Sequence, residues 1–207
     1  MSRHIVLAGD STIDNAAYVA PGQDVTTLLR GLAGEARITS IACDGGLVEQ
    51  TIDRLSWVPA DATHLFLSVG GNDALLEIDL LQRPARSVGE ALAAVKPTLD
   101  RFRQDYARLL ATVARRRLSV AVASIYAPWF EDAGRRLAVE MALPLFNEAI
   151  LAECFRYGCS LIDLRLLFDR PGDFSHEIEP SAEGGAKLAA AVARWAADDG
   201  QGMRVYA

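Results

Sequence analysis

Five short runs of Val, Ile, Leu and Ala constrain the fold of this chain more than any other feature. They are apolar almost throughout and do not alternate polar and apolar residues, a pattern typical of parallel strands that are covered on both faces. The strands that we expect are residues 4–8, 37–42, 64–69, 118–124 and 160–164.

Patterns with helical period separate these runs. They cover residues 24–32, 47–55, 88–117, 135–157 and 182–197, and Pro97 is expected to kink the longest one or to mark its true start. Because strands and helices alternate, right-handed crossovers predict an α/β fold, a flavodoxin-like three-layer α/β/α sandwich with a five-stranded parallel sheet. The 207 residues, 51% of them hydrophobic, are expected to form one domain over residues 1–207.

The charge and cysteine content argue against several classes of protein. A net charge of −6 gives no basic surface for nucleic acid. The three cysteines lack the CxxC spacing of zinc and redox sites, and their number suits a reducing compartment. The first strand begins too early to leave room for a signal peptide, and no apolar stretch is long enough for a membrane span. We therefore expect a cytoplasmic protein.

Four polar motifs stand where expected strands end. They are Gly9-Asp10-Ser11, Asp44-Gly45-Gly46, Gly70-Gly71-Asn72-Asp73 and Asp173-Phe174-Ser175-His176. In open parallel sheets, ligands bind beyond the carboxyl ends of the strands, so the four motifs predict a common site.

The first three motifs each have a structural and a functional interpretation. Ser11 is either the N-cap of a helix or a nucleophile whose own N–H faces the carbonyl that it attacks. Gly45 either permits a tight turn or donates an unobstructed N–H to an oxyanion. Asn72 either forms an Asx turn or presents its side-chain NH₂ as a further donor.

The fourth motif supplies a base. The chain has three histidines, and His4 and His64 lie at the amino ends of their strands, away from the expected site. His176 is therefore the candidate general base, since an imidazole titrates near neutrality. Asp173, three residues earlier, is positioned to orient the ring.

Together these motifs resemble those of the SGNH hydrolase superfamily, the GDSL-type esterases and lipases, over nearly the whole chain. The resemblance implies a serine hydrolase that cleaves an ester or related acyl bond of a small molecule, without a metal or organic cofactor. It implies Ser11 as nucleophile, His176 as base and Asp173 as the residue that orients the base. The Ser11 and Gly45 amides and the Asn72 side chain would form the oxyanion hole.

The chain departs from the family pattern after the histidine, where Pro usually follows directly. Here Glu177-Ile178-Glu179 intervenes before Pro180, and alignment on this proline would place Glu179 at the histidine position. We prefer His176, because a carboxylate is a weak base near neutral pH unless burial raises its pKa.

Two other functions remain open from the sequence. One is a non-catalytic member of the same fold that binds an acyl or carbohydrate group. The other is a flavodoxin-like phosphate or nucleotide module, although no GxxxxGK[ST] or GxGxxG follows a strand. Residues 127–130 are expected either to wall an acyl pocket with Trp129 and Phe130 or to cover the core. Residues 77–86 form a further candidate wall or lid. The substrate and the oligomeric state are left open.

Overall fold

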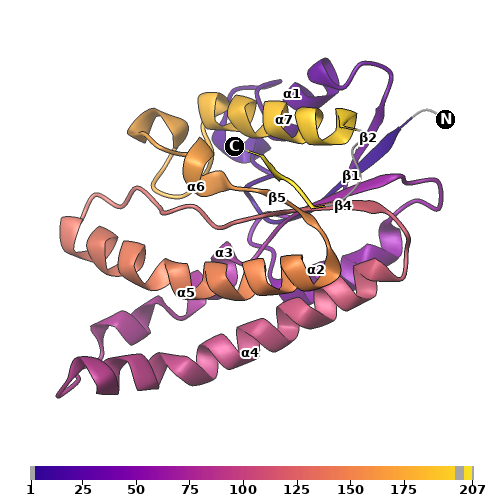
Figure 1. Ribbon diagram of the computed structural model, residues 1–207. Coiled ribbons are helices and arrows are strands. Elements are labelled where there is room, and N and C mark those ends of the chain that lie inside the picture. The colour runs from indigo at the N-terminus through magenta and orange to yellow at the C-terminus, as the bar shows by residue number, and fades with distance from the viewer. Residues whose placement is uncertain (1–2, 199–202, 207) are drawn as a thin grey trace.

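Six parallel strands form a single sheet that helices cover on both faces (Figure 1). The computed structural model describes residues 3–198 and 203–206. The sheet has the order β2-β1-β3-β4-β5-β6. Its strands are β1 (His4–Gly9), β2 (Arg37–Ser40), β3 (His64–Ser68), β4 (Ser119–Ala123), β5 (Ser160–Ile162) and β6 (Val205–Tyr206).

The predicted three-layer α/β/α sandwich is confirmed, with one strand more than expected. The additional strand β6 is two residues long and pairs with the edge strand β5, where Leu161 is the partner of Val205. A strand this short carries no periodic pattern. Its pairing is decided by the neighbouring strand and not by its own sequence.

The helices are divided between the two faces. Figure 1 shows α1 (Val25–Leu32) and α7 (Ala182–Ala197) together on one side of the sheet. The helices α2 (Val48–Arg54), α4 (Val88–Ala114) and α5 (Ala133–Tyr157) lie on the other side. Short elements complete the chain: α3 (Gly71–Leu76), α6 (Leu164–Leu167), and the 3₁₀ turns η1 (Ala16–Tyr18), η2 (Leu55–Trp57), η3 (Ile78–Gln82) and η4 (Pro171–Asp173).

The alternation of side chains along β1 explains why both faces are covered. Ile5 and Leu7 pack into the cluster formed with α1 and α7, whereas Val6 and Ala8 pack into the cluster formed with α2, α4 and α5. All four are essentially inaccessible to solvent. Full burial of a side chain such as Ile or Leu contributes about 1.5–3 kcal/mol, so a strand buried on both faces anchors both layers.

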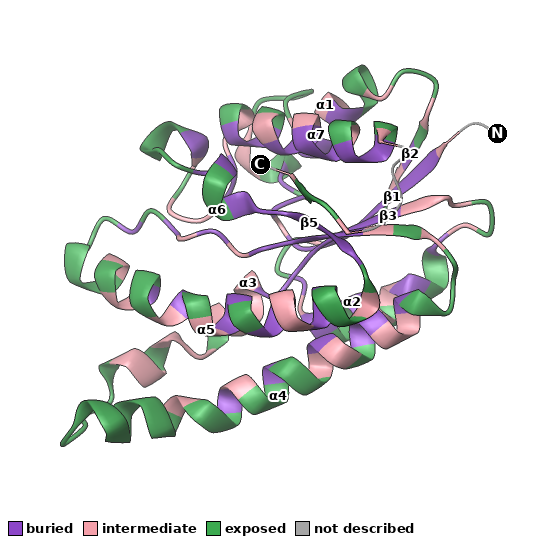
Figure 2. Cartoon of the chain, viewed as in Figure 1, coloured by how far each residue is buried: buried purple, intermediate pink, exposed green. Residues whose placement is uncertain are grey.

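The expectation that Pro97 might mark the start of α4 is wrong. The helix begins at Val88, where the Ser87 side chain accepts a hydrogen bond from the Glu90 N–H, and Pro97 lies inside it. The first part of α4 is exposed (Figure 2), including the turn before Pro97. Water can therefore reach the carbonyl that the missing proline N–H leaves without a partner, which lowers the cost of the interruption.

No helix within residues 3–198 and 203–206 has both the length and the apolar composition needed to span a bilayer.

Asn15 connects the segment after β1 to the loop before α7. Its side chain is fully buried, its Oδ1 accepts a hydrogen bond from the Val25 N–H (2.9 Å), and its Nδ2 donates one to the Pro180 carbonyl (3.1 Å). One side chain thus holds the start of α1 and the start of α7 to the carboxyl end of β1.

We expect Asn15→Ala to lower the free energy of unfolding by about 1–3 kcal/mol, because it leaves two buried backbone groups without partners. Urea denaturation measures the change. Gln23→Ala is the matched control, since this amide is exposed. Equal stabilities for the two variants would contradict the structural role of Asn15.

Candidate active site

The candidate site lies at the carboxyl end of β1, where the order of the sheet changes direction. β1 is flanked by β2 and β3, so the loops after these three strands meet at a topological switch point. The backbones approach closely here. A Cβ added to Gly9, whose φ is +143°, would lie 1.8 Å from the Ser68 carbonyl oxygen. Only glycine fits this position, and the turn that it forms is followed by Asp10 and Ser11.

Asp10 holds the turn that presents Ser11. It is buried, and its Oδ1 accepts a hydrogen bond from the Thr12 N–H (3.0 Å). Burial raises the pKa of this carboxyl to about 7, against the lowering effect of the Thr12 hydrogen bond. Ser11, the next residue, is half-buried at the surface of a cavity.

The second motif packs against the first through backbone atoms. A Cβ added to Gly46 would lie 2.8 Å from the Cys43 carbonyl oxygen and 2.9 Å from that of Gly9. The preceding residue, Gly45, has a φ of +70°. Within the described chain, neither the Gly45 N–H nor the Ser11 N–H donates a hydrogen bond. Two backbone N–H groups in the loops after β1 and β2 are therefore available as donors.

The third motif is joined to the second by side-chain hydrogen bonds. Asn72 Nδ2 donates to the Gly46 carbonyl (3.2 Å), and the Asp73 carboxylate accepts from the Val48 N–H (3.2 Å) at the start of α2. An amide nitrogen carries two protons, so Asn72 keeps a second N–H for a ligand. The structure thus brings Ser11, Gly45 and Asn72 to one edge of the sheet.

The fourth motif begins a loop that is closed at its base. A β-bridge pairs Phe174 with Pro180, and the Ser175 N–H donates to the Glu179 carbonyl (3.0 Å). We refer to residues 174–180 as the bridge loop. Its outer part is fixed by the Trp129 N–H, which donates to the Glu177 carbonyl (2.7 Å).

His176 lies near the tip of the bridge loop and is exposed. Its ring contacts the ring of Tyr18 edge to face, with 5.8 Å between centroids. The Tyr18 hydroxyl donates to Asp44 Oδ2 (2.7 Å), which raises the pKa of Tyr18 to about 12. Tyr18 therefore connects the histidine to the loop after β2.

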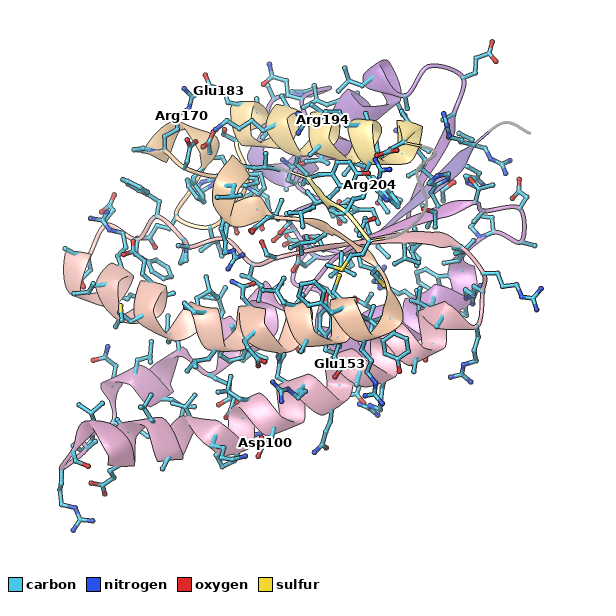
Figure 3. The ribbon with its side chains drawn as sticks, viewed as in Figure 1. Asp100, Glu153, Arg170, Glu183, Arg194 and Arg204 are labelled. Atoms are coloured by element: carbon cyan, nitrogen blue, oxygen red, sulfur yellow. The ribbon has the colours of Figure 1, made fainter. Side chains whose placement is uncertain are left out.

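Asp173 is buried and its carboxylate is bound elsewhere. Its Oδ2 accepts hydrogen bonds from Lys187 Nζ (2.8 Å) and the Asp169 N–H (3.0 Å), and Arg170 Nε lies 3.7 Å from Oδ1. Figure 3 shows Arg170 beside Glu183 above this turn, and the two form an ion pair (3.1 Å). These contacts tie the turn before the bridge loop to α7.

The described part of the chain shows no hydrogen bond from His176 to Asp173 or to Ser11. The first three motifs lie at the same edge of the sheet. The catalytic roles of Ser11, Gly45, Asn72, Asp173 and His176 all stay predictions. The contact of His176 with this part of the chain is its ring contact with Tyr18, which lies seven residues after Ser11.

Two adjoining spaces open at this edge. The first, the inner cavity, encloses about 960 Å³, part of it open to solvent. Ser11 and Asn72 lie on its surface and the rest of its lining is mostly apolar, including Leu75, Ile78, Leu80, Leu81, Val95, Ala142, Leu143 and Phe146. The second, the outer hollow, is lined by Tyr18, Trp129, Phe130, Arg135, His176 and Glu179, among others. Leu75 and Ile178 line both spaces.

Several wall residues were only partly foreseen from the sequence. Ile78, Leu80 and Leu81 show that residues 77–86 contribute a wall to the inner cavity. Trp129 and Phe130 line the outer hollow and not the inner cavity. Tyr126 lines the inner cavity, and its hydroxyl donates to the Ile178 carbonyl (2.5 Å). The sequence around Tyr126 does not distinguish it from an aromatic residue of the core.

The described residues contain no group of three or more His, Cys, Asp or Glu side chains arranged to hold a metal ion.

Solved structures with the same fold are numerous. No family model and no curated protein matches the sequence. The acetylxylan esterase Axe2 of Geobacillus stearothermophilus superimposes with a TM-score of 0.69 at 15% identity, covering 95% of each chain.

Two further structures extend the likeness to lipolytic proteins. An extracellular lipase of Streptomyces rimosus gives a TM-score of 0.67 at 13% identity, over 90% of this chain and 96% of that one. A member of the lipolytic G-D-S-L family from Veillonella parvula gives 0.64 at 16% identity, over 91% and 95%. This chain has the three-layer fold of the GDSL/SGNH hydrolases, whose motifs its sequence resembles.

Proposed function

We propose that this protein is a serine hydrolase that cleaves esters of apolar acyl groups through an acyl-enzyme on Ser11. The observation that carries the proposal is the arrangement around Ser11. It lies at the switch point of the sheet, on the surface of a mostly apolar cavity that Asn72 also lines, and among the described residues the Ser11 and Gly45 N–H groups donate no hydrogen bond. Esterases and lipases with the same fold support this choice of reaction.

In the proposed reaction the Ser11 hydroxyl attacks the carbonyl carbon of the ester and gives its proton to His176. The negative charge that develops on the carbonyl oxygen is stabilised by the Ser11 and Gly45 N–H groups and by Asn72. Collapse of this intermediate releases the alcohol, which takes the proton from His176. Water then attacks the acyl-enzyme and gives a proton to His176. The bond between the acyl carbon and Ser11 Oγ breaks, Ser11 takes the proton back from His176, and the carboxylic acid is released.

His176 must come within hydrogen-bond reach of Ser11 for the first step. The two residues line adjoining spaces that share Leu75 and Ile178 as walls. Catalytic hydrogen bonds often tighten only when substrate is bound. The absence of a Ser11–His176 hydrogen bond in the described chain is also the observation that favours the alternative, a non-catalytic protein that binds acyl or carbohydrate groups.

Ser11→Ala should abolish both ester hydrolysis and labelling by a fluorophosphonate probe, because both require the hydroxyl. Hydrolysis of p-nitrophenyl butyrate and the mass of the labelled protein measure the two effects. Ser56→Ala is the control, since Ser56 is exposed and its hydroxyl binds only the Asp53 carbonyl in the described chain. Wild-type protein that resists labelling would favour the non-catalytic alternative.

Asn72→Ala should lower kcat by about 10²–10³ with a smaller change in KM, the usual loss for one oxyanion donor. Steady-state kinetics measure both constants. Gln104→Ala on α4 is the matched control, because this amide is exposed. A kcat within threefold of the wild type would remove Asn72 from the proposed oxyanion hole.

The inner cavity predicts which acyl groups are accepted. Ala142 lies on its wall, whereas the adjacent Met141 is exposed on the same helix. Ala142→Trp should therefore shorten the cavity, and Met141→Trp should not. Because each buried CH₂ contributes about 0.8 kcal/mol, exclusion of two or three methylenes should cost about tenfold to fiftyfold in kcat/KM.

A series of p-nitrophenyl esters from acetyl to decanoyl measures this effect. The loss in Ala142→Trp should appear for octanoyl and decanoyl esters and leave the acetyl ester nearly unchanged. An equal loss for every chain length would show that the acyl group does not enter the inner cavity.

A further inference from the structure

Glu131, Glu177 and Glu179 line the outer hollow together with His176 and Tyr18. Of these three carboxylates, Glu179 is the buried one. Only 8% of the Glu179 surface is exposed. Ionisable side chains in loops are usually much more exposed than this. A buried carboxylate in a polar site usually has a partner that compensates the loss of water.

The bridge loop fixes Glu179 while its tip carries His176. The Glu179 carbonyl accepts the Ser175 N–H (3.0 Å), and the Pro180 carbonyl accepts the Asn15 side chain (3.1 Å). Asn15 lies four residues after Ser11. Glu179 is thus held next to the segment that carries the nucleophile, three residues from the histidine in the same closed loop.

His176 is the cationic partner that this arrangement offers to Glu179. Burial raises the pKa of Glu179, and the His176 charge and nearby backbone N–H groups act in the opposite direction. Asp44, Tyr18 and Tyr126 also interact electrostatically with Glu179, and none of them carries a positive charge. Glu131, Glu177 and Arg135 are the other titratable groups that line the outer hollow.

Lysine and arginine do not take this place in the described chain. Among the described residues none of them forms an ion pair with Glu179, and His176 does not lie within ion-pair distance of it either. Arg135 also lines the outer hollow, but its guanidinium lies 4.1 Å from the centre of the Phe130 ring. Asp173, the carboxylate expected beside the histidine, is bound by Lys187 and by the turn at Asp169.

We propose that Glu179, and not Asp173, is the positioning residue that orients the His176 imidazole and stabilises its protonated form. The proposal rests on the proposed function, in which His176 receives the Ser11 proton. The imidazolium formed in that step would then be stabilised by the opposite charge of the Glu179 carboxylate.

Two variants with opposite expectations test the assignment. Glu179→Gln should lower kcat by about 10²–10⁴ with little change in KM, by analogy with the loss of the orienting carboxylate in a serine protease triad. It should also move the acidic limb of the pH profile of kcat/KM to lower pH, because the protonated ring loses its stabilising charge. Asp173→Asn should lower stability and leave the position of this limb unchanged.

Two further variants serve as controls. Glu179→Asp keeps the charge and should recover at least tenfold of the activity lost in Glu179→Gln. Glu177→Gln alters a carboxylate of the same loop that accepts the Glu131 N–H (2.9 Å), and it should stay within threefold of the wild type. A shift of the acidic limb in Asp173→Asn but not in Glu179→Gln would overturn the proposal.

A measurement that does not depend on turnover separates this proposal from the proposed function. The ring protons of His176, assigned from the spectrum of His176→Asn, can be titrated by NMR. Glu179→Gln should move the titration midpoint to lower pH, and an unchanged midpoint would overturn the proposed interaction. A shifted midpoint in a protein whose Ser11 resists the fluorophosphonate would support the interaction and contradict the hydrolase function.

Discussion

The arrangement of the candidate site depends on the close approach of two backbones at the carboxyl ends of β1 and β3. Gly9 lies so near Ser68 that no side chain fits, and the Asp10 N–H donates to the Ser68 carbonyl (3.0 Å). This contact turns the chain sharply at the last residue of β1. The loop after β2 then packs against the same turn through Gly46. Ser11 therefore owes its position to backbone geometry, which a change of side chain elsewhere in the site leaves intact.

The two ends of the candidate site are built differently. The proposed oxyanion donors belong to loops that follow adjacent strands, and they are held by main-chain contacts and by Asn72. The proposed base belongs to the bridge loop, which follows β5 in the chain and is connected to the site through Asn15 and Tyr18. The proposed oxyanion donors are part of the sheet edge, whereas the bridge loop is held against this edge by side-chain contacts.

The sequence predicted the parts of the molecule that depend on short-range patterns. Apolar runs located the five principal strands, because burial on both faces restricts composition strongly. The motifs at the strand ends indicated that Ser11, Gly45 and Asn72 follow strands at one edge, and the catalytic roles of these residues stay predictions. The strand β6 escaped prediction because only its pairing with β5 makes it a strand. The sequence did not show whether α4 begins at Pro97 or continues through it. That outcome depends on whether water can reach the carbonyl before the proline, which a sequence pattern does not give.

The partner of Asp173 illustrates a second limit. The spacing of Asp173 and His176 predicts a pair, but Lys187, on the facing side of α7, competes for the same carboxylate. The position of Lys187 relative to the turn at Asp169 is set by tertiary packing and not by the local sequence. A motif with the correct spacing therefore identifies candidate residues, and the packing of the last helix decides which contacts they make.

The bridge between Phe174 and Pro180 has a consequence for how this protein can change over time. The two ends of the loop are joined to each other by this bridge and by the Ser181 N–H, which donates to the Asp173 carbonyl (2.8 Å), and Asn15 binds the Pro180 carbonyl. Residues added to or removed from its tip alter none of these contacts. Insertions and deletions at the loop tip can therefore change the position of His176 during evolution without altering the sheet or the glycine turns at its edge.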